Sequence, residues 1–383
     1  MTIIIFSSQI EGHFLEYVHH VYELALDRAE DRFVFLLPSA FIDVKDKFEW
    51  EAKSYITFEL FDEHKSKTTQ KGFANLLGES YRTSKLVAHA ARKYQADYVF
   101  SNTIINFVPF APSFIKKPAK LIGILYRIYL HDMGSRSKMS LITDKLKYRL
   151  MARSRVFHKL FVLNDSESAT ILNNIYKTNK FCHIADPYIP ILMEHAEDIR
   201  SQYRLGRNKI MFIHFGAMNT NKGTIEILES IRALSDKEKG DYCFFFAGRV
   251  STGITDRFYR LYNELKDEVQ IIVKDEFCSY EFFASLCIAC DAILTPYRRT
   301  AQSSGLIGYA SQFGKPVIAV NKGLLGQLVR EYELGILIED NDPHSLMEGY
   351  RKIAEGTYKK PTKRYCEQNS IKSFQKAISN SFV

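Results

Sequence analysis

The sequence predicts an α/β protein built from two doubly wound domains that face each other across a cleft. Short apolar segments alternate with segments of helical periodicity along the chain of 383 residues. Strands that are joined by helical crossovers form parallel sheets with helices on both faces. The alternation lapses over residues 188–208, where polar residues dominate, and we expect the seam between the domains there.

Each predicted strand is a short apolar run bounded by polar or turn-forming residues. Apolar residues recur at helical spacing in most of the intervening segments, for example over Phe14–Arg28, Gly223–Leu234 and Ser279–Cys290. The predicted strands are Ile3–Ser7, Phe33–Leu37, Tyr98–Ser101, Lys120–Leu125, Leu160–Asn164 and Lys180–Ile184 in the first half, and Ile210–Gly216, Tyr242–Gly248, Gln270–Val273, Ala292–Pro296, Pro316–Val320 and Gly335–Ile338 in the second.

The composition is that of a soluble globular protein, with 46% hydrophobic and 25% charged residues. No segment approaches the roughly 18 consecutive apolar residues that a bilayer-spanning helix needs. The first residues, Met1–Ser8, lack the basic leader of a secretory signal and read as a buried strand. Six scattered cysteines fit a reducing compartment, so we expect a cytoplasmic protein.

Two short motifs suggest metal binding but have simpler interpretations. Cys287 and Cys290 lie in a predicted helix with no second cysteine pair or histidine nearby, which favours a buried helix face. Asp340 and Asp342 precede a proline and an apparent helix, which turn and cap chemistry explains. The sequence therefore predicts no metal site.

The most informative segment for function covers residues 297–319. It reads as a polar loop after a strand, a helix that opens at Ser303, Ser304 and Gly305, and a further strand. The unpaired N–H groups and the dipole of a helix start favour an anion, most often a phosphate. Arg298 and the arginine after it add positive charge. An ordinary capped connection would show the same pattern, so both interpretations stay open.

Lys222 is the second candidate for an anion site. It lies in the segment Asn219–Gly223, directly after the strand that we predict for Ile210–Gly216. Asn and Gly also favour a plain solvated turn. However, open parallel sheets bind ligands beyond the carboxyl ends of their strands, which favours a ligand-binding lysine.

Two histidines of the first half, His13 and His131, also follow apparent strands. Glu11 and Gly12 precede His13 and would lie beside the cleft. A loop histidine is often structural, so both interpretations remain open for each. Phe277 follows a predicted strand of the second half, where an aromatic ring either abuts a nucleobase or packs in the core.

Five pieces of the sequence occur in an order that is typical of one enzyme family. The pieces are Leu160–Pro187, Phe215–Gly223, Tyr242–Gly248, Val269–Pro296 and Gly314–Ala319. Together they resemble the retaining glycosyltransferases of family 4 (glycosyl transferases group 1), which have the two-Rossmann GT-B architecture. The likeness runs from about Lys120 to Ala354.

The resemblance implies a division of labour between the domains. Residues 1–190 would form an acceptor-binding Rossmann-like domain, and residues 191–360 a domain that binds a nucleotide sugar. The tail over residues 361–383 would cross back to the first domain. The reaction would need neither a metal ion nor another cofactor, because the leaving phosphate itself accepts the acceptor's proton.

The resemblance also implies the roles of the candidate site residues. Lys222 and His131 would be catalytic, and Phe277 would lie on the nucleobase side. Glu11, Gly12 and His13 would lie on the acceptor side, and the donor diphosphate would contact Gly216, Lys222, Arg298, Ser303, Ser304 and Gly305.

Three positions depart from the family pattern. Ala301 and Tyr309 stand where the family usually has two glutamates, and Ala217 replaces an arginine of the loop that carries Lys222. These losses put the usual sugar contacts in doubt. They leave open a catalytically inactive relative that binds a nucleotide sugar or a glycan.

Charge is concentrated between Lys116 and Lys159, with twelve Lys and Arg against two acids. Met139, Ile142, Leu146 and Leu150 fall near helical spacing among these basic residues. Such a segment suits an anionic membrane surface, whereas the same apolar stripe could also be core. Because no nucleic-acid-binding motif accompanies the charge, we expect no nucleic acid partner.

These observations together predict a retaining hexosyltransferase that acts on a nucleotide diphosphate sugar. Its acceptor would be a glycan, expected to be lipid-linked, in the assembly of a surface polysaccharide such as a capsule or lipopolysaccharide. The enzyme would be cytoplasmic and peripheral on the inner face of the membrane. The inactive relative and a sugar-nucleotide epimerase, which shares the two-domain architecture, are the alternatives.

Overall fold

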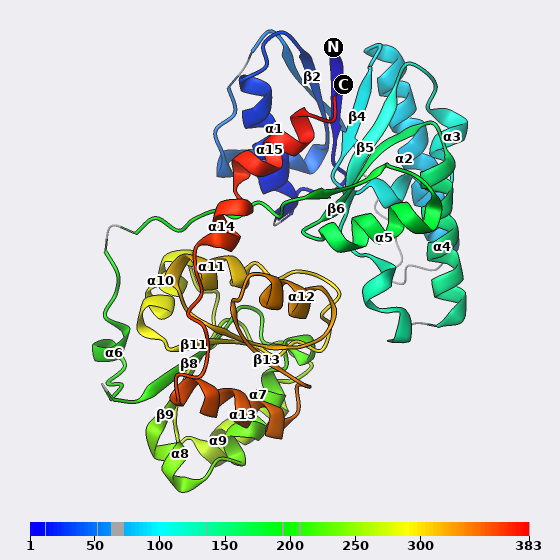
Figure 1. Ribbon diagram of the computed structural model, residues 1–383. Coiled ribbons are helices and arrows are strands. Elements are labelled where there is room, and N and C mark those ends of the chain that lie inside the picture. The colour runs from blue at the N-terminus through cyan, green and yellow to red at the C-terminus, as the bar shows by residue number, and fades with distance from the viewer. Residues whose placement is uncertain are drawn as a thin grey trace. The chain divides into compact units, whose positions relative to one another are not determined.

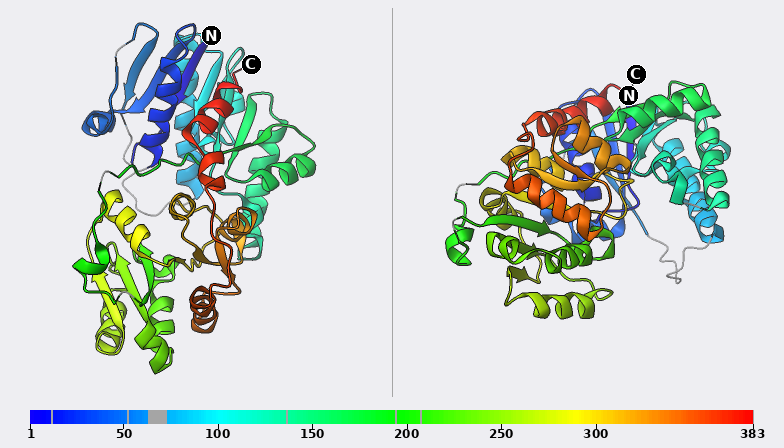
Figure 2. Two further views of the ribbon diagram at one scale, coloured as in Figure 1. Left: turned by 60° about the vertical axis from the view of Figure 1, so that its left-hand side comes forward. Right: turned by 60° about the horizontal axis from the view of Figure 1, so that its bottom comes forward.

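The computed structural model describes residues 1–11, 13–51, 53–62, 73–135, 137–193, 195–206 and 208–382. The chain forms two compact units (Figure 1). Unit 1 comprises residues 1–187 and 370–383, and unit 2 comprises residues 188–369. Each unit is a parallel sheet with helices on both faces (Figure 2).

Unit 1 contains a seven-stranded parallel sheet in the order β3-β2-β1-β4-β5-β6-β7. The order reverses between β1 and β4, because the chain builds the sheet outwards from β1 first in one direction and then in the other. Its strands are β1 (Thr2–Phe6), β2 (Arg32–Pro38), β3 (Ile56–Phe61), β4 (Tyr98–Ser101), β5 (Lys120–Leu125), β6 (Phe157–Leu163) and β7 (Phe181–Ile184), and its helices are α1 (His13–Leu26), α2 (Phe73–Lys93), α3 (Ala111–Phe114), α4 (Lys138–Arg153), α5 (Ser166–Tyr176) and α15 (Ile371–Ser379).

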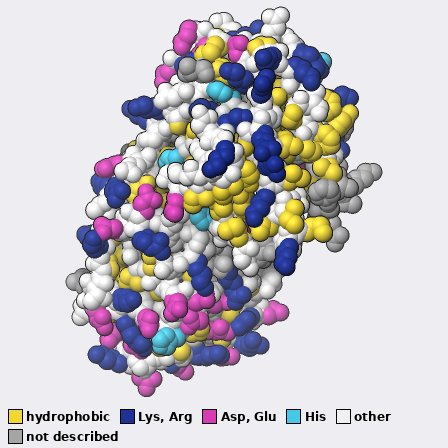
Figure 3. Space-filling view, turned by 45° about the vertical axis from the view of Figure 1, so that its right-hand side comes forward, with side chains coloured by type: hydrophobic (Ala, Val, Ile, Leu, Met, Phe, Trp, Pro, Cys, Tyr) yellow, Lys and Arg dark blue, Asp and Glu magenta, His cyan; other side chains and the backbone are white. Residues whose placement is uncertain are grey.

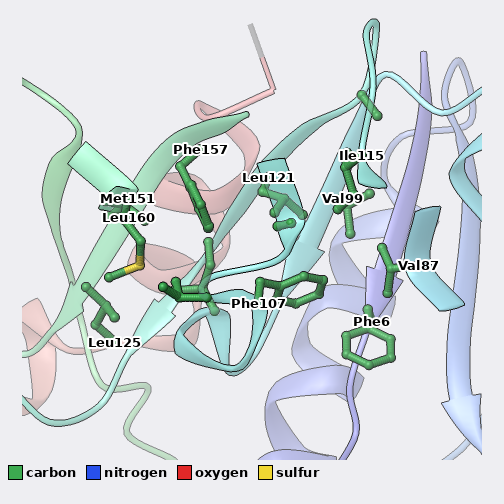
Figure 4. Close-up of a cluster of buried hydrophobic side chains, with 14 of the residues drawn as sticks. Phe6, Val87, Val99, Phe107, Ile115, Leu121, Leu125, Met151, Phe157 and Leu160 are labelled. Carbon is green, nitrogen blue, oxygen red and sulfur yellow. The ribbon is translucent and has the colours of Figure 1, made fainter. Parts of the chain in front are cut away.

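The sheet of unit 1 has a hydrophobic core on each face. Successive strand residues point to opposite faces, so Ile4 and Phe6 enter one core while Ile3 and Ile5 enter the other. Figure 4 shows part of the first core, to which Val87 of α2 and Met151 of α4 belong together with strand residues such as Leu121. Burial on both faces explains why the strands are continuous apolar runs.

The last helix, α15, packs beside α1 in unit 1 (Figure 1). Phe374 and Ile378 are fully buried in the core that also contains Val18 and Tyr22. The side-chain amide of Gln375 donates to the carbonyl oxygen of His20 at 2.9 Å. The C-terminal segment is therefore an integral part of the first sheet's covering layer.

Unit 2 contains a six-stranded parallel sheet in the order β10-β9-β8-β11-β12-β13. The strand order reverses between β8 and β11, which are hydrogen-bonded neighbours. Its strands are β8 (Ile210–Phe215), β9 (Tyr242–Ala247), β10 (Gln270–Lys274), β11 (Ala292–Thr295), β12 (Val317–Val320) and β13 (Gly335–Ile338), and its helices are α6 (Ile199–Gln202), α7 (Thr224–Arg232), α8 (Asp236–Asp241), α9 (Thr255–Leu265), α10 (Tyr280–Ala289), α11 (Leu306–Phe313), α12 (Gly323–Glu331), α13 (Pro343–Ala354) and α14 (Arg364–Gln368).

The α/β fold with two parallel sheets is confirmed, and each of the predicted strands is present within a few residues of its predicted bounds. The apolar pattern of the sequence does not predict strand β3. It lies at the edge of its sheet, and only Ile56 of its residues is fully buried. An edge strand that is half exposed mixes polar and apolar residues, so it lacks the continuous apolar run that marks the others.

The structural interpretation of the cysteine pair is also confirmed. Cys287 lies on the buried face of α10 and Cys290 directly follows that helix, and both side chains are almost fully buried. Burial raises the pKa of the Cys290 thiol to about 12, so this thiol stays protonated and packs as an apolar group. Among the described residues, no helix combines the length and the apolar character that crossing a bilayer requires.

Candidate functional site

The loop after β8 begins with a glycine in a backbone conformation that other residues rarely adopt. Gly216 has φ of +99°, and a Cβ atom built on it would meet no atom within 4 Å. Its backbone N–H donates to the carbonyl oxygen of Ala247 on β9 at 2.9 Å. The loop therefore leaves the sheet with its backbone open on one side, where a ligand can approach closely.

The loops after β8 and β11 are locked together by close backbone contact. Gly223 has φ of +71°, and a Cβ atom on it would lie 2.3 Å from the carbonyl oxygen of Pro296. The backbone N–H of Arg298 donates to the carbonyl oxygen of Asn221 at 2.9 Å. The Asn219 side chain caps the turn by accepting from the N–H of Asn221 and of Lys222. Lys222 is therefore held at the point where the strand order reverses.

A hydroxyl group joins the lysine of the first loop to the serine of the second. The ammonium group of Lys222 donates to the Tyr297 hydroxyl at 2.7 Å. The same hydroxyl lies 3.2 Å from Oγ of Ser304. Tyr297 and Ser304 are buried, whereas Lys222 is half-buried. An ammonium group has three N–H donors, so Lys222 keeps two for a ligand after it has bonded to Tyr297.

Arg298 is paired with a carboxylate inside the protein. Its guanidinium group forms an ion pair with Oε1 of Glu226 on α7, and its Nε lies 3.0 Å from the same oxygen. Glu226 is buried, and its Oε2 has no hydrogen-bond partner among the described residues. The carboxylate offsets the charge of Arg298, so this part of the site is less positive than the sequence suggests.

Helix α11 begins later than expected. The sequence predicts a helix that opens at Ser303, Ser304 and Gly305, but the helix covers Leu306–Phe313, with the exposed Gly305 as its N-cap. The Ser304 side chain accepts from the N–H of Leu306 at 3.4 Å while it also contacts Tyr297. The backbone N–H groups of residues 306–308 bond within the protein. The exposed Gly305 is therefore the part of this helix start whose backbone a ligand can reach.

A buried histidine, His214, stabilises the loop after β8. Nε2 of His214 lies 3.0 Å from Oγ1 of Thr224, and Nδ1 lies 3.2 Å from the carbonyl oxygen of Leu294. Burial lowers the pKa of His214 to about 4, and the nearby charge of Lys222 adds to this effect. The histidine is therefore neutral at pH 7, and it ties β8 and β11 to the first turn of α7.

The remaining candidates of unit 2 lie outside this network. Phe277 follows β10 and is 79% exposed, so the core-packing alternative is wrong for this residue. Ala301 lies in the loop before α11. Tyr309 lies on α11 and packs against the rings of Tyr188 and Phe283. The side chain of Tyr309 is thus committed to aromatic packing.

In unit 1, His131 is held by an acid at the start of α5. Nε2 of His131 lies 2.6 Å from Oδ2 of Asp165 and 3.3 Å from Oγ of Ser168. Burial raises the pKa of Asp165, but hydrogen bonds from His131 and Ser168 outweigh this effect, and the net pKa is lowered. Asp165 also caps α5 by accepting from the N–H of Ser168. The imidazole is therefore oriented by an ionised carboxylate.

The loop after β1 brings His13 to a cluster of tyrosines. The His13 ring lies 5.5 Å from that of Tyr17 and 5.6 Å from that of Tyr126. The Tyr17 hydroxyl donates to Asp186 at 2.5 Å, and burial raises the pKa of the Tyr126 hydroxyl well above its usual value. Glu11 is exposed in the same loop, and Gly12 lies outside the described residues.

Sequence reasoning did not assign roles to four residues of these networks. Glu226 and Tyr297 position the cations of unit 2, and Asp165 and Tyr126 surround the histidines of unit 1. Tyr126, Asp165 and Tyr297 each follow a strand within two residues, at the edge of the sheet where ligands bind. That position is the sequence signal that could have identified them.

Residues 195–373 match the model of the family described as Glycosyl transferases group 1. This match covers nearly all of unit 2, including the loops after β8 and β11. No curated protein sequence matches the chain. The family resemblance that the sequence predicts is confirmed for this part of the chain.

Solved structures of similar fold cover the whole chain. A glycosyltransferase from Rickettsia africae has 16% identity and a TM-score of 0.64, with 100% of this chain and 92% of that chain covered. WaaG, a glycosyltransferase involved in lipopolysaccharide biosynthesis, has 15% identity and a TM-score of 0.64, with 100% of both chains covered. Anabaena HepE in complex with UDP has 16% identity and a TM-score of 0.69, with 100% and 99% covered.

These similarities establish the fold. The order of the strands, the two parallel sheets and the matching structures identify the GT-B type, which confirms the predicted fold class. At such low identity, the ligands of the matching proteins remain facts about those proteins. HepE was also solved with UDP-glucose.

Proposed function

Since residues 195–373 match the model of the glycosyl transferases group 1 family, we propose that this protein is a retaining glycosyltransferase. It moves a sugar from a nucleotide diphosphate to a hydroxyl of a lipid-linked glycan, for a surface polysaccharide. One observation carries the proposal. Lys222 and Ser304, from the loops after β8 and β11, meet at the Tyr297 hydroxyl where the strand order reverses. Open α/β sheets bind their ligands at this point.

The chemistry of the donor supports this role for Lys222. The bond between the anomeric carbon and the diphosphate oxygen breaks, and negative charge develops on the departing phosphate. A fixed donor that is aimed at such charge stabilises the transition state by about 3–4 kcal/mol. Lys222 supplies two N–H donors, and the backbone at Gly216 and Gly305 is open for close approach.

The same arrangement suits a transfer with retained configuration and without a metal ion. The acceptor oxygen forms its bond to the anomeric carbon on the face that the phosphate leaves, and the acceptor proton passes to the phosphate. No protein base is needed for this step. The positive charge of Lys222 meets the charge of the diphosphate, whereas that of Arg298 is offset by Glu226.

Unit 1 supports the acceptor side of the proposal. His131 is oriented by Asp165, and it offers a ring nitrogen for a sugar hydroxyl in its neutral or charged form. Glu11 and His13 follow β1, next to the strand-order reversal of that sheet. Phe277 is exposed and can stack on a nucleobase. That HepE binds UDP and UDP-glucose makes a uridine nucleotide the first donor to test.

A catalytically inactive relative is the second candidate. Ala217, Ala301 and Tyr309 replace charged residues of the family pattern, and Arg298 is bound by Glu226 inside the protein. Such a protein would still bind a nucleotide sugar through Lys222, but it would not turn it over.

Two measurements on the full chain separate these candidates. First, thermal unfolding is recorded with UDP, GDP and other nucleoside diphosphates, because a ligand that binds the folded state raises its apparent stability. Second, nucleotide sugars are incubated with the protein, and the products are analysed by NMR. Free sugar with the donor's anomeric configuration supports transfer, whereas binding without turnover supports the inactive relative. An epimeric nucleotide sugar, or no stabilisation by any nucleotide, contradicts the proposal.

A further inference from the structure

Large hydrophobic side chains are exposed together on α4, on α5 and in the loop before α4. Sixteen large hydrophobic side chains are exposed among the described residues, and six of them belong to this one surface. We call it the α4–α5 surface; its apolar members are Met133, Met139, Ile142, Leu146, Ile171 and Ile175.

Helix α4 carries apolar residues on both its buried and its exposed sides. Tyr148 and Met151 face the core of unit 1. On the opposite side, Met139, Ile142 and Leu146 follow one another at helical spacing and are 78%, 66% and 63% exposed. The core alternative for this apolar stripe is therefore wrong for these three residues, whereas it holds for Leu150, which packs against the core of unit 1. A helix that exposes so much apolar surface has an outward face that needs a partner.

The surface is hollowed as well as apolar. A cavity of about 730 Å³ lies between α4 and α5 and is lined mainly by apolar atoms. Ile142, Leu146, Ile171 and Ile175 contribute to its wall. Tyr176 and Lys145 also line it, and the Tyr176 hydroxyl donates to the carbonyl oxygen of Lys145 at 3.2 Å.

Basic residues predominate around this surface, although α5 exposes one acid, Glu167, in its first turn. Every exposed charged residue of α4 is basic, namely Lys138, Lys145, Arg149 and Arg153. The acid of this helix, Asp144, is partly buried and lies 4.0 Å from Lys147. Figure 3 shows hydrophobic side chains gathered with Lys and Arg on the side of the molecule that includes these helices.

We propose that the α4–α5 surface docks the protein on an anionic lipid bilayer. The exposed Met139, Ile142 and Leu146 enter the boundary between headgroups and acyl chains, while the flanking ammonium and guanidinium groups bind lipid phosphates. The cavity takes part of an acyl chain. This inference rests on the proposed function, because an enzyme that acts on a lipid-linked acceptor must reach the membrane. Its test measures vesicle binding and does not depend on turnover.

Charge favours a bilayer over the other possible partners. A second copy of the same surface would bring Lys145 and Arg149 against their own equivalents, and like charges across an interface repel. A nucleic acid would satisfy the charges but would leave the aliphatic side chains in water. An anionic bilayer satisfies both features at once.

The test is flotation of the full chain with vesicles of equal parts phosphatidylglycerol and phosphatidylcholine. We expect binding that weakens with salt and is lost with vesicles of phosphatidylcholine alone. The double variant Ile142→Ser/Leu146→Ser removes apolar groups, and Lys145→Gln/Arg149→Gln removes charge. Each should weaken partitioning into the vesicles at least about tenfold.

Matched controls separate the surface from general properties of the protein. Ile42→Ser/Leu192→Ser removes two exposed apolar side chains elsewhere, and Lys237→Gln/Lys266→Gln makes the same change in net charge. These controls should bind vesicles like the parent chain. Because all the changed residues are exposed, far-ultraviolet circular dichroism should be the same for every variant.

Three outcomes would overturn the proposal. These are a parent chain that does not float with the anionic vesicles at low salt, surface variants that bind no worse than their controls, and a dimer that Ile142→Ser/Leu146→Ser dissociates while vesicle binding is absent. Hydrolysis of a nucleotide sugar in solution would continue in each case. Failure of this inference is thus distinct from failure of the proposed transfer reaction.

Discussion

The two units share a topology but differ in charge where their strand order reverses. In unit 2, the loops after β8 and β11 present Lys222 beside two hydroxyl groups. In unit 1, the loop and helix after β1 lie near carboxylates: Tyr17 bonds to Asp186, and burial together with Asp186 raises the pKa of Glu16. The topology decides where a ligand binds, and the side chains decide its charge. Unit 2 suits an anion, and unit 1 suits a neutral hydroxyl compound.

Removing the ammonium group of Lys222 in unit 2 should have the largest effect on turnover. Lys222→Ala should lower kcat about a hundredfold, because one fixed donor to the charge of the transition state is lost. Lys322→Ala is the matched control, since Lys322 follows β12 and pairs with Asp340 at the surface. Steady-state kinetics with a turned-over nucleotide sugar measure both variants. Equal turnover in the parent chain and in Lys222→Ala would refute the role of this lysine.

Lowering the pH should reduce the free energy of unfolding of unit 2, because His214 is buried in its neutral form. Between pH 6.5 and about 4 the unfolded chain binds a proton that the folded chain excludes, so the free energy of unfolding falls as the pH is lowered. The full effect is about 3 kcal/mol. Urea unfolding at pH 7 and pH 4 should show a smaller loss for His214→Gln than for the parent chain.

The control for this pH effect is His344→Gln, which changes an exposed histidine of unit 2. Asp165 of unit 1 has the same sign of pH dependence but acts at lower pH. Its lowered pKa contributes stability that is lost only as the pH falls below the usual value of 3.8. A loss between pH 7 and pH 4 that is the same with and without His214 would contradict the assignment to unit 2.

The loops after β8 and β11 approach so closely that a methyl group added at Gly223 should destabilise the protein. Gly223→Ala should lower the free energy of unfolding by about 2–3 kcal/mol, because a left-handed backbone and a clash with Pro296 both oppose the new methyl group. Gly253→Ala is the control, since a Cβ atom there meets nothing within 4 Å. Chemical denaturation gives both values. Equal stability of the two variants would show that the loops are not tightly held.

Tyr297→Phe tests whether the lysine must be positioned. The loss of the hydroxyl should lower kcat about tenfold while the thermal stabilisation by a nucleoside diphosphate changes little, because Lys222 keeps its charge but loses its fixed direction. Tyr350→Phe removes a buried tyrosine hydroxyl that lies 2.8 Å from Ser230, away from the loops. This control should alter stability alone. Equal loss of kcat in both would indicate a general packing effect.

Treatment with a chelator should have the smallest effect. If Lys222 supplies the positive charge, EDTA leaves turnover unchanged, because no metal ion is needed to stabilise the leaving phosphate. The assay uses protein that was dialysed against EDTA and then tested with and without added Mg²⁺. Loss of turnover that Mg²⁺ restores would contradict metal independence.

Particular residues show which parts of the candidate site the sequence can predict and which it cannot. Lys222 and Ser304 could be selected because each follows a strand that the apolar pattern marks clearly. Glu226 could not be selected, because its partner Arg298 lies 72 residues further along the chain. His131 was selected, but Asp165, which lies 34 residues away and orients it, was not. The pattern along a chain reports local periodicity, whereas these pairs arise from strand order.

The sequence by itself determined the alternation of strands and helices, since buried strands need apolar runs and helices need periodic ones. It also determined the GT-B resemblance and the basic character of the segment that includes α4. Only the tertiary structure decided which loops meet, that Tyr297 joins Lys222 to Ser304, and that Met139 and Ile142 face outwards. The physical reason is that burial and contact depend on how distant segments pack, which no local pattern specifies.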